Sequence, residues 1–303
     1  IDSNISIVNK LKKEGFNCFE SINNLNKLNK KIDFAIIANW GPDHINSANA
    51  LFKLGCKKFI IEKPVSNNLK ELSIFEKIIK ENKIFVTVHH HWKYVGIEKL
   101  IKENASKYDL NEPVGIRLVG GALGLCTNGI HWLDLSQEIL ESPFESVVAD
   151  LDIDYINPRD ESLAFIGGMS SFKMRNKSFI HVSFSNKNSQ SIRAEIVYRN
   201  GIIDISTKGI EGKLTIYKRK QDNLNNYEKI TRHAVFNMID QVEFFNKRTV
   251  PDVLDDLLIS DSPKVSIERA KKSLEMIIGA IQSSNQNKKI EWNQIEDQNI
   301  RIS

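Results

Sequence analysis

The sequence predicts an α/β protein with two parts: a Rossmann-like parallel sheet, truncated at its N-terminal side, and an α+β domain with a mostly antiparallel open sheet. Short β-rich runs alternate with helical patterns in the first third, whereas strands separated by polar turns follow from about residue 113. The chain has 303 residues, of which 41% are hydrophobic, enough for two ordinary domain cores. We expect a first domain at 1–110, with the parallel sheet, and a second domain at 111–303, with the open sheet.

The first part contains three β-rich segments at 33–38, 58–61 and 84–89, which are free of Pro and rich in branched or aromatic residues. Between them, apolar residues recur every three or four positions, over 45–52 and again over 69–79. Strands that alternate with helices in this way form right-handed βαβ units. A parallel sheet is therefore expected.

The second part is expected to be an open sheet followed by two helices. Residues 179–184 alternate apolar and polar side chains, which predicts a strand with one buried face, and Asn200-Gly201 predicts a hairpin turn. Helical patterns are expected at 236–245 and 265–281. The further expected strands cover 114–119, 146–153, 163–172, 193–198 and 202–206. Because helices would cover one face only, the other face is a candidate surface for a homo-oligomer.

Composition excludes several classes of function. The 42 basic and 38 acidic residues are spread along the chain, so nucleic acid is not an expected partner. No apolar run approaches the roughly 20 residues of a membrane span. Three cysteines without a CxxC pair fit a reducing cytoplasm. In the run 89–91 only His89 and His91 could converge, because neighbours on a strand point to opposite faces, and we expect no metal site.

Two segments follow predicted parallel strands at the edge where ligands bind. Residues 38–44 (ANWGPDH) open a helix, whose free N–H groups suit a phosphate or a ribose, although an ordinary strand-to-helix turn has the same pattern. Glu62-Lys63-Pro64 ends the next strand, and Pro64 restricts the backbone of Lys63. A positioned ammonium stabilises charge on a substrate oxygen. In isolation, such a tripeptide also fits a surface ion pair.

A third segment, 120–134, is rich in glycine and leads into a predicted helix that carries His131 and Asp134. Their spacing puts both on one helical face, so Asp134 could orient the imidazole, and His131 is suited to take a hydroxyl proton. A histidine near an apolar helix is also commonly structural.

Together, in this order, these segments resemble the Gfo/Idh/MocA family of sugar and cyclitol oxidoreductases. The EKP signature is intact, and His131 lies in a matching glycine-rich context. The resemblance implies an enzyme that uses NAD or NADP and acts on a secondary alcohol or ketone of a sugar, cyclitol or nucleotide sugar. It implies Lys63 and His131 as catalytic residues and Lys93 as a substrate contact, and it places on the nicotinamide side Asn39, Trp40, His44, Glu62, Lys63 and Pro64.

The sequence departs from the family pattern in the cofactor-binding region. No G-x-G-x-x-G precedes the strand at 33–38, so we expect the chain to begin at the end of the family's second strand. Asp2 would then accept hydrogen bonds from the adenosine ribose, which favours NAD. A sheet without its central strand is expected to be less stable and to bind NAD poorly.

A second departure is Thr127, four residues before His131, where relatives usually carry aspartate. Threonine cannot act as a carboxylate base, although Asn128 could still bond a sugar hydroxyl. We expect substrate contacts from Thr127, Asn128 and Asp134. The alternative is a non-catalytic regulator that binds a sugar or a dinucleotide on the same scaffold.

Overall fold

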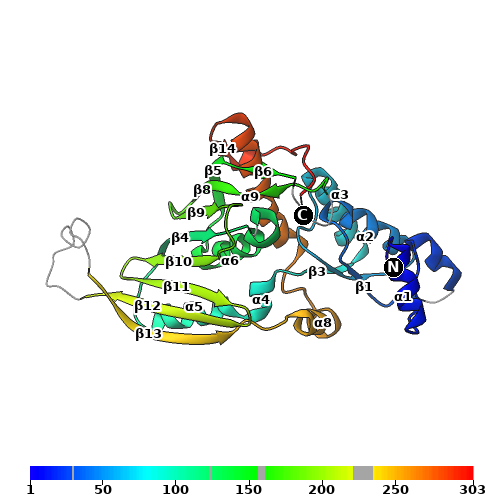
Figure 1. The fold of residues 1–303 in the computed structure, drawn as a ribbon, viewed down its shortest axis with the longest axis horizontal. Coiled ribbons are helices and arrows are strands. Elements are labelled where there is room, and N and C mark those ends of the chain that lie inside the picture. The colour runs from blue at the N-terminus through cyan, green and yellow to red at the C-terminus, as the bar shows by residue number, and fades with distance from the viewer. Residues whose placement is uncertain (29–30, 123, 156–160, 221–234, 303) are drawn as a thin grey trace.

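The computed structural model describes residues 1–28, 31–122, 124–155, 161–220 and 235–302. Its elements form a small parallel sheet and a large mixed sheet, joined through helices α4, α8 and α9 (Figure 1). This arrangement confirms the predicted fold class. The domain division at residues 110 and 111 stays a prediction. In the described part of the chain, no helix has both the length and the apolar character that a membrane span needs.

The small sheet has the order β1-β2-β3, with all pairs parallel. Its strands match three of the predicted segments, because β-branched and aromatic residues fill the centre of the layer. Phe59 and Ile61 of β2 are fully buried, and Leu72 and Phe75 of α3 pack with them in the same core. The bounds are β1 Ala35–Ile37, α2 His44–Lys53, β2 Lys58–Ile61, α3 Leu69–Asn82 and β3 Phe85–Val88.

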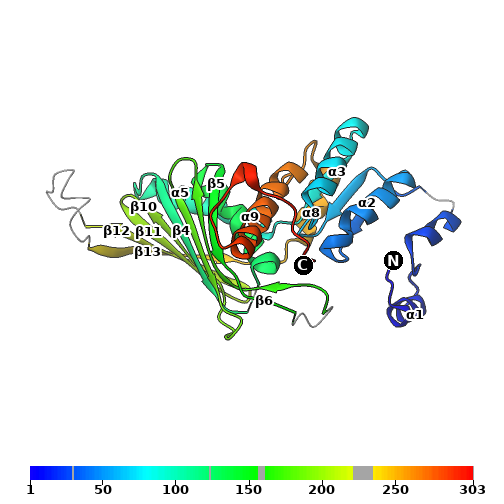
Figure 2. The same ribbon diagram turned by 90° about the horizontal axis from the view of Figure 1, so that it is seen from above.

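The N-terminal segment lies at the far end of the molecule, beyond the edge strand β1 (Figure 2). It contains α1 (Ile5–Lys13) and the 3-10 helix η1 (Ile22–Leu28). Asn4 caps α1 through its side chain, and Val8 is the one buried residue of that helix. At the edge of the sheet, Ile36 is 51% exposed. The packing of this end is therefore sparse.

The large sheet has nine strands in the order β13-β12-β11-β10-β4-β9-β8-β5-β14. All neighbours are antiparallel except β4 and β9. Helices α6 and α9 pack against β4 and β5 on one face, and exposed Val119, Val148 and Met169 lie on the strands at alternating positions. The bounds are β4 Pro113–Gly120, β5 Phe144–Asp150, β8 Gly168–Met174, β9 Phe179–Phe184, β10 Arg193–Tyr198, β11 Gly201–Lys208, β12 Glu211–Arg219, β13 Phe236–Phe245 and β14 Ile290–Glu291.

Helices α4 (His91–Val95), α8 (Val250–Ile259) and α9 (Ile267–Gln286) join the two sheets. The other helices of the second part are α5 (Ile97–Lys107) and α6 (Ile130–Leu140), and β6 (Ile153–Asp154) pairs with β7 (Phe165–Ile166) as a separate small ribbon. Asp256 of α8 is buried and accepts hydrogen bonds from the hydroxyls of Thr87 at 2.8 Å and Tyr94 at 2.9 Å. Asp297 of the C-terminal tail accepts from the backbone N–H of Leu69, at the start of α3. The second part of the chain thus holds the first at several points.

The helix predicted at 236–245 is wrong, because these residues form β13. They pair with β12 along their whole length, with one irregularity between Ile216 and Tyr217. The first four residues of β13, which include Phe236 and Met238, are all exposed, so burial shows a period of two only from residue 240 onward. Long-range pairing with β12, a strand that the sequence analysis did not anticipate, decides the structure here.

Candidate active site

The ends of β1 and β2 are joined by a buried histidine. The two ring nitrogens of His44 lie 2.8 Å from the carbonyl oxygen of Pro64 and 3.0 Å from that of Asn39. Burial lowers the pKa of His44, although both carbonyl contacts oppose this. His44, predicted to line the nicotinamide side, therefore supports the backbone at both strand ends.

Lys63 links the two sheets. Its ammonium donates a hydrogen bond of 2.7 Å to the backbone carbonyl of Thr127. Thr127 lies in a π-helical turn, Gly124–Gly129, that leads into α6. Gly124 has a φ of +69°, and a Cβ there would lie 2.5 Å from the Thr127 hydroxyl, so the turn requires glycine. At Thr127 the backbone meets the lysine of the EKP signature, although the side chain lacks a carboxylate.

His131 sits at the start of α6 with a fixed ring orientation. Its Nδ1 accepts a hydrogen bond of 3.2 Å from the backbone N–H of His91. Burial, together with the charge of Lys63, holds the pKa of His131 well below its usual value of 6.5. The neutral ring then carries its proton on Nε2. His131 is arranged as a hydrogen-bond donor.

A cavity of about 230 Å³ lies at this point. Glu62 and His131, both predicted site residues, face it from different sheets, together with Asn128. The indole rings of Trp92 and Trp132 also contribute to the wall, with ring centroids 4.7 Å apart. The cavity combines hydrogen-bonding groups with aromatic surface.

A chain of hydrogen bonds that the sequence analysis missed continues from the cavity. The Nδ1 of His89 lies 2.7 Å from the carboxylate of Glu62, and its Nε2 lies 2.7 Å from the hydroxyl of Thr249. His91 contacts the same hydroxyl at 3.2 Å and Asn246 at 2.6 Å. His89 and His91 converge, as their spacing predicted, but they meet on a threonine that is 158 residues from His91. No sequence pattern marks Thr249 or Asn246.

Three predicted substrate contacts, Thr127, Lys93 and Asp134, are not among the residues that line this cavity. The ammonium of Lys93 pairs with Glu98 at 2.8 Å and Glu138 at 3.4 Å. Asp134 accepts two hydrogen bonds from the guanidinium of Arg269, at 2.8 and 2.7 Å. Its nearest histidine nitrogen is that of His90, at 3.9 Å, so Asp134 does not orient His131 as the helical spacing suggested. Both side chains stabilise the packing behind the site.

A second cavity, of about 650 Å³, lies at the C-terminal end of β1. Asp2, Ser21, Asn39 and Trp40 are among its lining residues. One carboxylate oxygen of Asp2 accepts from the backbone N–H of Asn4, and Asn39 donates to Ser47 at 3.0 Å. A carboxylate beside hydroxyl and amide groups, next to a strand end, fits the ribose of a dinucleotide. Three of the predicted cofactor contacts, Asp2, Asn39 and Trp40, thus line one cavity, and their assignment to NAD stays a prediction.

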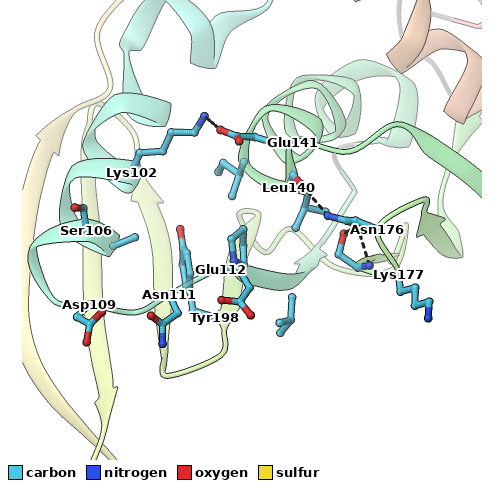
Figure 3. A pocket seen from close by; sticks show the side chains of 15 residues that line it. Lys102, Ser106, Asp109, Asn111, Glu112, Leu140, Glu141, Asn176, Lys177 and Tyr198 are labelled. Carbon is cyan, nitrogen blue, oxygen red and sulfur yellow. Dashed lines mark hydrogen bonds and ion pairs between the residues drawn. The ribbon is translucent and has the colours of Figure 1, made fainter.

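The largest hollow of those described here, about 940 Å³, lies away from these residues. Lys102, Glu141, Asn176 and Tyr198 line it, between α5, α6 and β10 (Figure 3). Lys102 pairs with Glu141, and Asn176 donates to the carbonyl of Leu140 at 3.1 Å. None of the predicted site residues belongs to it.

Comparison with known proteins identifies the N-terminal part. Residues 2–90 match the model of the Gfo/Idh/MocA family, described as an oxidoreductase family with an NAD-binding Rossmann fold. The resemblance to the Gfo/Idh/MocA family is confirmed. The predicted cofactor class, NAD or NADP, agrees with the description of this family. No curated protein matches the sequence.

Solved structures share the fold over nearly the whole chain. An NAD-binding protein from Listeria innocua is 17% identical, with a TM-score of 0.72, and the match covers 96% of this chain and 90% of that one. The WlbA dehydrogenase from Chromobacterium violaceum, solved with NADH and UDP-GlcNAcA, is 13% identical, with a TM-score of 0.70 over 96% and 86% of the two chains. A super-repressor mutant of Gal80p from Saccharomyces cerevisiae is 14% identical, with a TM-score of 0.66 over 96% and 88%. At these identities the likeness shows the Gfo/Idh/MocA fold alone.

Proposed function

We propose that this protein is an NAD(P)-dependent oxidoreductase that acts on a secondary alcohol or ketone of a sugar, cyclitol or nucleotide sugar. The observation that carries the proposal is the bond between Lys63 and the carbonyl of Thr127. It brings the EKP signature of one sheet to the segment that carries His131. Two groups that stabilise charge on oxygen are thus brought near each other: His131 lines the cavity, and Lys63 follows the lining residue Glu62 directly in sequence.

Lys63 and His131 have complementary roles in this proposal. The ammonium of Lys63 and the Nε2–H of neutral His131 bind the reacting oxygen and stabilise the negative charge that develops on it. Because Nδ1 accepts from a backbone N–H, His131 acts as a donor and not as the proton acceptor expected from the sequence. A bound nicotinamide supplies or accepts the hydride.

Sugar chemistry is supported by the lining of the cavity. Glu62, His89 and Asn128 offer donors and acceptors for neighbouring hydroxyl groups, and Trp92 and Trp132 offer apolar surface for a ring. A relative of the same fold was solved with NADH and a UDP-sugar acid, which is in keeping with this substrate class.

We propose NAD as the preferred dinucleotide. Asp2 and Glu20 both line the cavity on the adenosine side. Two carboxylates accept hydrogen bonds from ribose hydroxyls, whereas they repel a 2′-phosphate. Asn39, Trp40 and Pro64 would lie toward the nicotinamide.

A non-catalytic regulator is the second candidate, favoured by one observation. Thr127 supplies a backbone carbonyl where relatives usually offer a carboxylate, so the site has one acidic group fewer. The similarity to Gal80p shows that the fold also occurs in a protein described as a repressor. Such a protein would bind sugar or dinucleotide without turnover.

Oligomer formation and location are further parts of the proposal. Val119, Val148 and Met169 give the open face of the large sheet an apolar component, which suits contact with a second copy. The cysteines Cys18, Cys56 and Cys126 are free thiols, which is in keeping with a reducing cytoplasm. Light scattering of the purified chain measures its oligomeric state.

The test of the proposed function is oxidation of NADH by the full chain with a panel of keto-sugars and oxidised UDP-sugars. Turnover that is lost in Lys63→Met and retained in Lys93→Met supports the enzyme, because the ammonium of Lys93 is paired with Glu98 and Glu138 and not directed to the segment that carries His131. Saturable binding of NADH with no turnover on any member of the panel would support the regulator instead. Isothermal titration measures that binding directly.

A further inference from the structure

The hydrogen bonds that run from Glu62 to Asn246 have acceptors at both ends. At one end is the carboxylate of Glu62, which contacts His89. At the other, Asn246 donates its amide N–H to the carbonyl of Gly209 at 3.1 Å, and this fixes its side-chain oxygen toward His91. Neither end supplies a proton while Glu62 is ionised. All protons must come from the groups between them.

Counting these protons gives a definite protonation state. The four contacts are Glu62 with His89, His89 with Thr249, Thr249 with His91, and His91 with Asn246. Each needs one hydrogen, and the Thr249 hydroxyl supplies one. The two rings must supply three, whereas two neutral imidazoles carry only two. One of the rings is therefore an imidazolium.

The contact of 2.7 Å with the Glu62 carboxylate makes His89 the better candidate for the ring that carries this extra proton. Burial lowers the pKa of His91, although its bond to Asn246 opposes this. Burial raises the pKa of Glu62, but the bond and charge of His89 together with the charge of Lys63 outweigh this, and the pKa is lowered overall. Glu62 is thus ionised and faces His89. The other titratable groups near His89 are Lys63, His90, Tyr94 and His131.

We propose that Glu62, His89, Thr249, His91 and Asn246 form a proton store that serves the reaction in the adjoining cavity, with Thr249 as its positioning residue. This inference rests on the proposed function for its role, but the stored proton itself does not depend on turnover. Thr249 is 2% exposed, and Glu62, His89 and His91 line the cavity. The store therefore has a buried centre at Thr249, and Glu62, His89 and His91 face the cavity.

The chemical step balances as follows for reduction of a ketone. A bound reduced nicotinamide would supply a hydride to the carbonyl carbon, and the electron pair of the C=O π bond would then move to oxygen. This oxygen takes one proton from the Glu62–His89 pair, through the carboxylate, so that His89 becomes neutral. The network then holds three protons for four contacts until solvent returns one. Oxidation of the alcohol is the reverse.

The stored proton is tested by nitrogen NMR of the full chain labelled at histidine, at pH 7 and without ligand. An unperturbed imidazole is about one quarter cationic at this pH. We expect one ring to be mostly cationic, and its signal to disappear in His89→Gln. If the His89 signal is one quarter cationic or less, the inference is overturned even if the protein turns over its substrate.

Thr249→Val and Thr249→Ser form the matched pair. Valine leaves two of the four contacts, which two neutral rings satisfy, so the imidazolium signal is expected to vanish. Serine keeps the hydroxyl and is expected to keep the signal. If the valine variant does not fold, the serine variant still decides, because loss of the signal in a folded serine variant contradicts the proposal.

The role in the reaction has its own readout. The kcat of Thr249→Val for ketone reduction is expected to fall at alkaline pH, where solvent replaces the lost proton slowly, and to approach that of the unmodified chain at acid pH. The serine variant should restore the original pH profile. Equal profiles for all three would show that the cationic ring has no part in turnover. Absence of turnover in every form would count against the proposed function alone.

Discussion

The two ends of the candidate site are built in different ways. At the reacting end, β2, β3, α6 and the segment before α8 each contribute a side chain or a carbonyl to one set of contacts. At the adenosine end, Asp2 contacts its neighbour Asn4, and α1 buries one residue. Tertiary packing therefore fixes the geometry of the chemistry, whereas local contacts fix the far end of the cofactor site. Changes at the two ends should affect different kinetic constants.

The largest effect is expected at Lys63. Lys63→Met removes the ammonium that stabilises charge on the reacting oxygen, and kcat should fall by about 1000-fold. Its KM for NADH should change little, because the adenosine end is untouched. Steady-state kinetics measure both constants, with circular dichroism as the check on folding. A fall in NADH affinity without a fall in kcat would contradict the separation of the two ends.

His131→Asn should have the next largest effect. It removes the Nε2–H donor, and we expect kcat to fall by about 100-fold. Because His131 acts as a neutral donor, the ring should stay neutral near pH 6.5. The pH profile of kcat for the unmodified chain should therefore show no titration of His131 there. Direct observation of His131 by NMR between pH 5 and 8 provides the check. A ring that titrates at its usual pH would refute the assigned role.

Asp2→Asn examines the adenosine end. Loss of charge-assisted hydrogen bonds to the ribose should raise the KM for NADH by about tenfold while kcat stays within about a factor of two. The KM for NADPH should fall, because one repelling carboxylate is gone. Measuring both dinucleotides on one preparation separates these effects. If kcat falls as strongly as in Lys63→Met, the two ends are coupled and the comparison fails.

The smallest effect on turnover, and the clearest on stability, is expected at His90. It is 1% exposed, and burial lowers its pKa, with Asp134 opposing this. His44, His91 and His131 also have lowered pKa values. Below pH 6.5, the usual pKa of histidine, these side chains are protonated in the unfolded chain but stay neutral in the folded protein. The free energy of unfolding therefore falls as pH decreases.

His90→Leu removes one of these histidines. The slope of the free energy of unfolding against pH should therefore decrease by about 1.4 kcal/mol per pH unit, which corresponds to one proton. Urea unfolding between pH 5 and 7 measures the slope. An unchanged slope would mean that His90 is already protonated in the folded protein at these pH values.

The sequence predicts the parallel sheet well because β2 and β3 are largely buried apolar runs and the helices between the strands have a strong period. It also predicts Lys63 and His131 as catalytic residues, since the EKP signature and the glycine-rich turn are local patterns, and this assignment stays a prediction. Thr249 and Asn246 are not predictable in this way, because they reach the site through the long pairing of β12 with β13. The same pairing explains why 236–245 is not a helix.

Asp134 illustrates a different limit. Helical spacing correctly places it on α6 near the site, but the spacing cannot show that Arg269 of α9 takes its carboxylate. That partner is 135 residues away in sequence.

The central claim is that Lys63 and His131 act on one reacting oxygen from two sheets. Comparison of kcat/KM for Lys63→Met, His131→Asn and the double variant tests it most directly, because groups that act as a unit are not additive. We predict that the double variant is about as slow as Lys63→Met alone. A double variant whose loss is the product of the two single losses would show that the two groups act independently and would contradict the account.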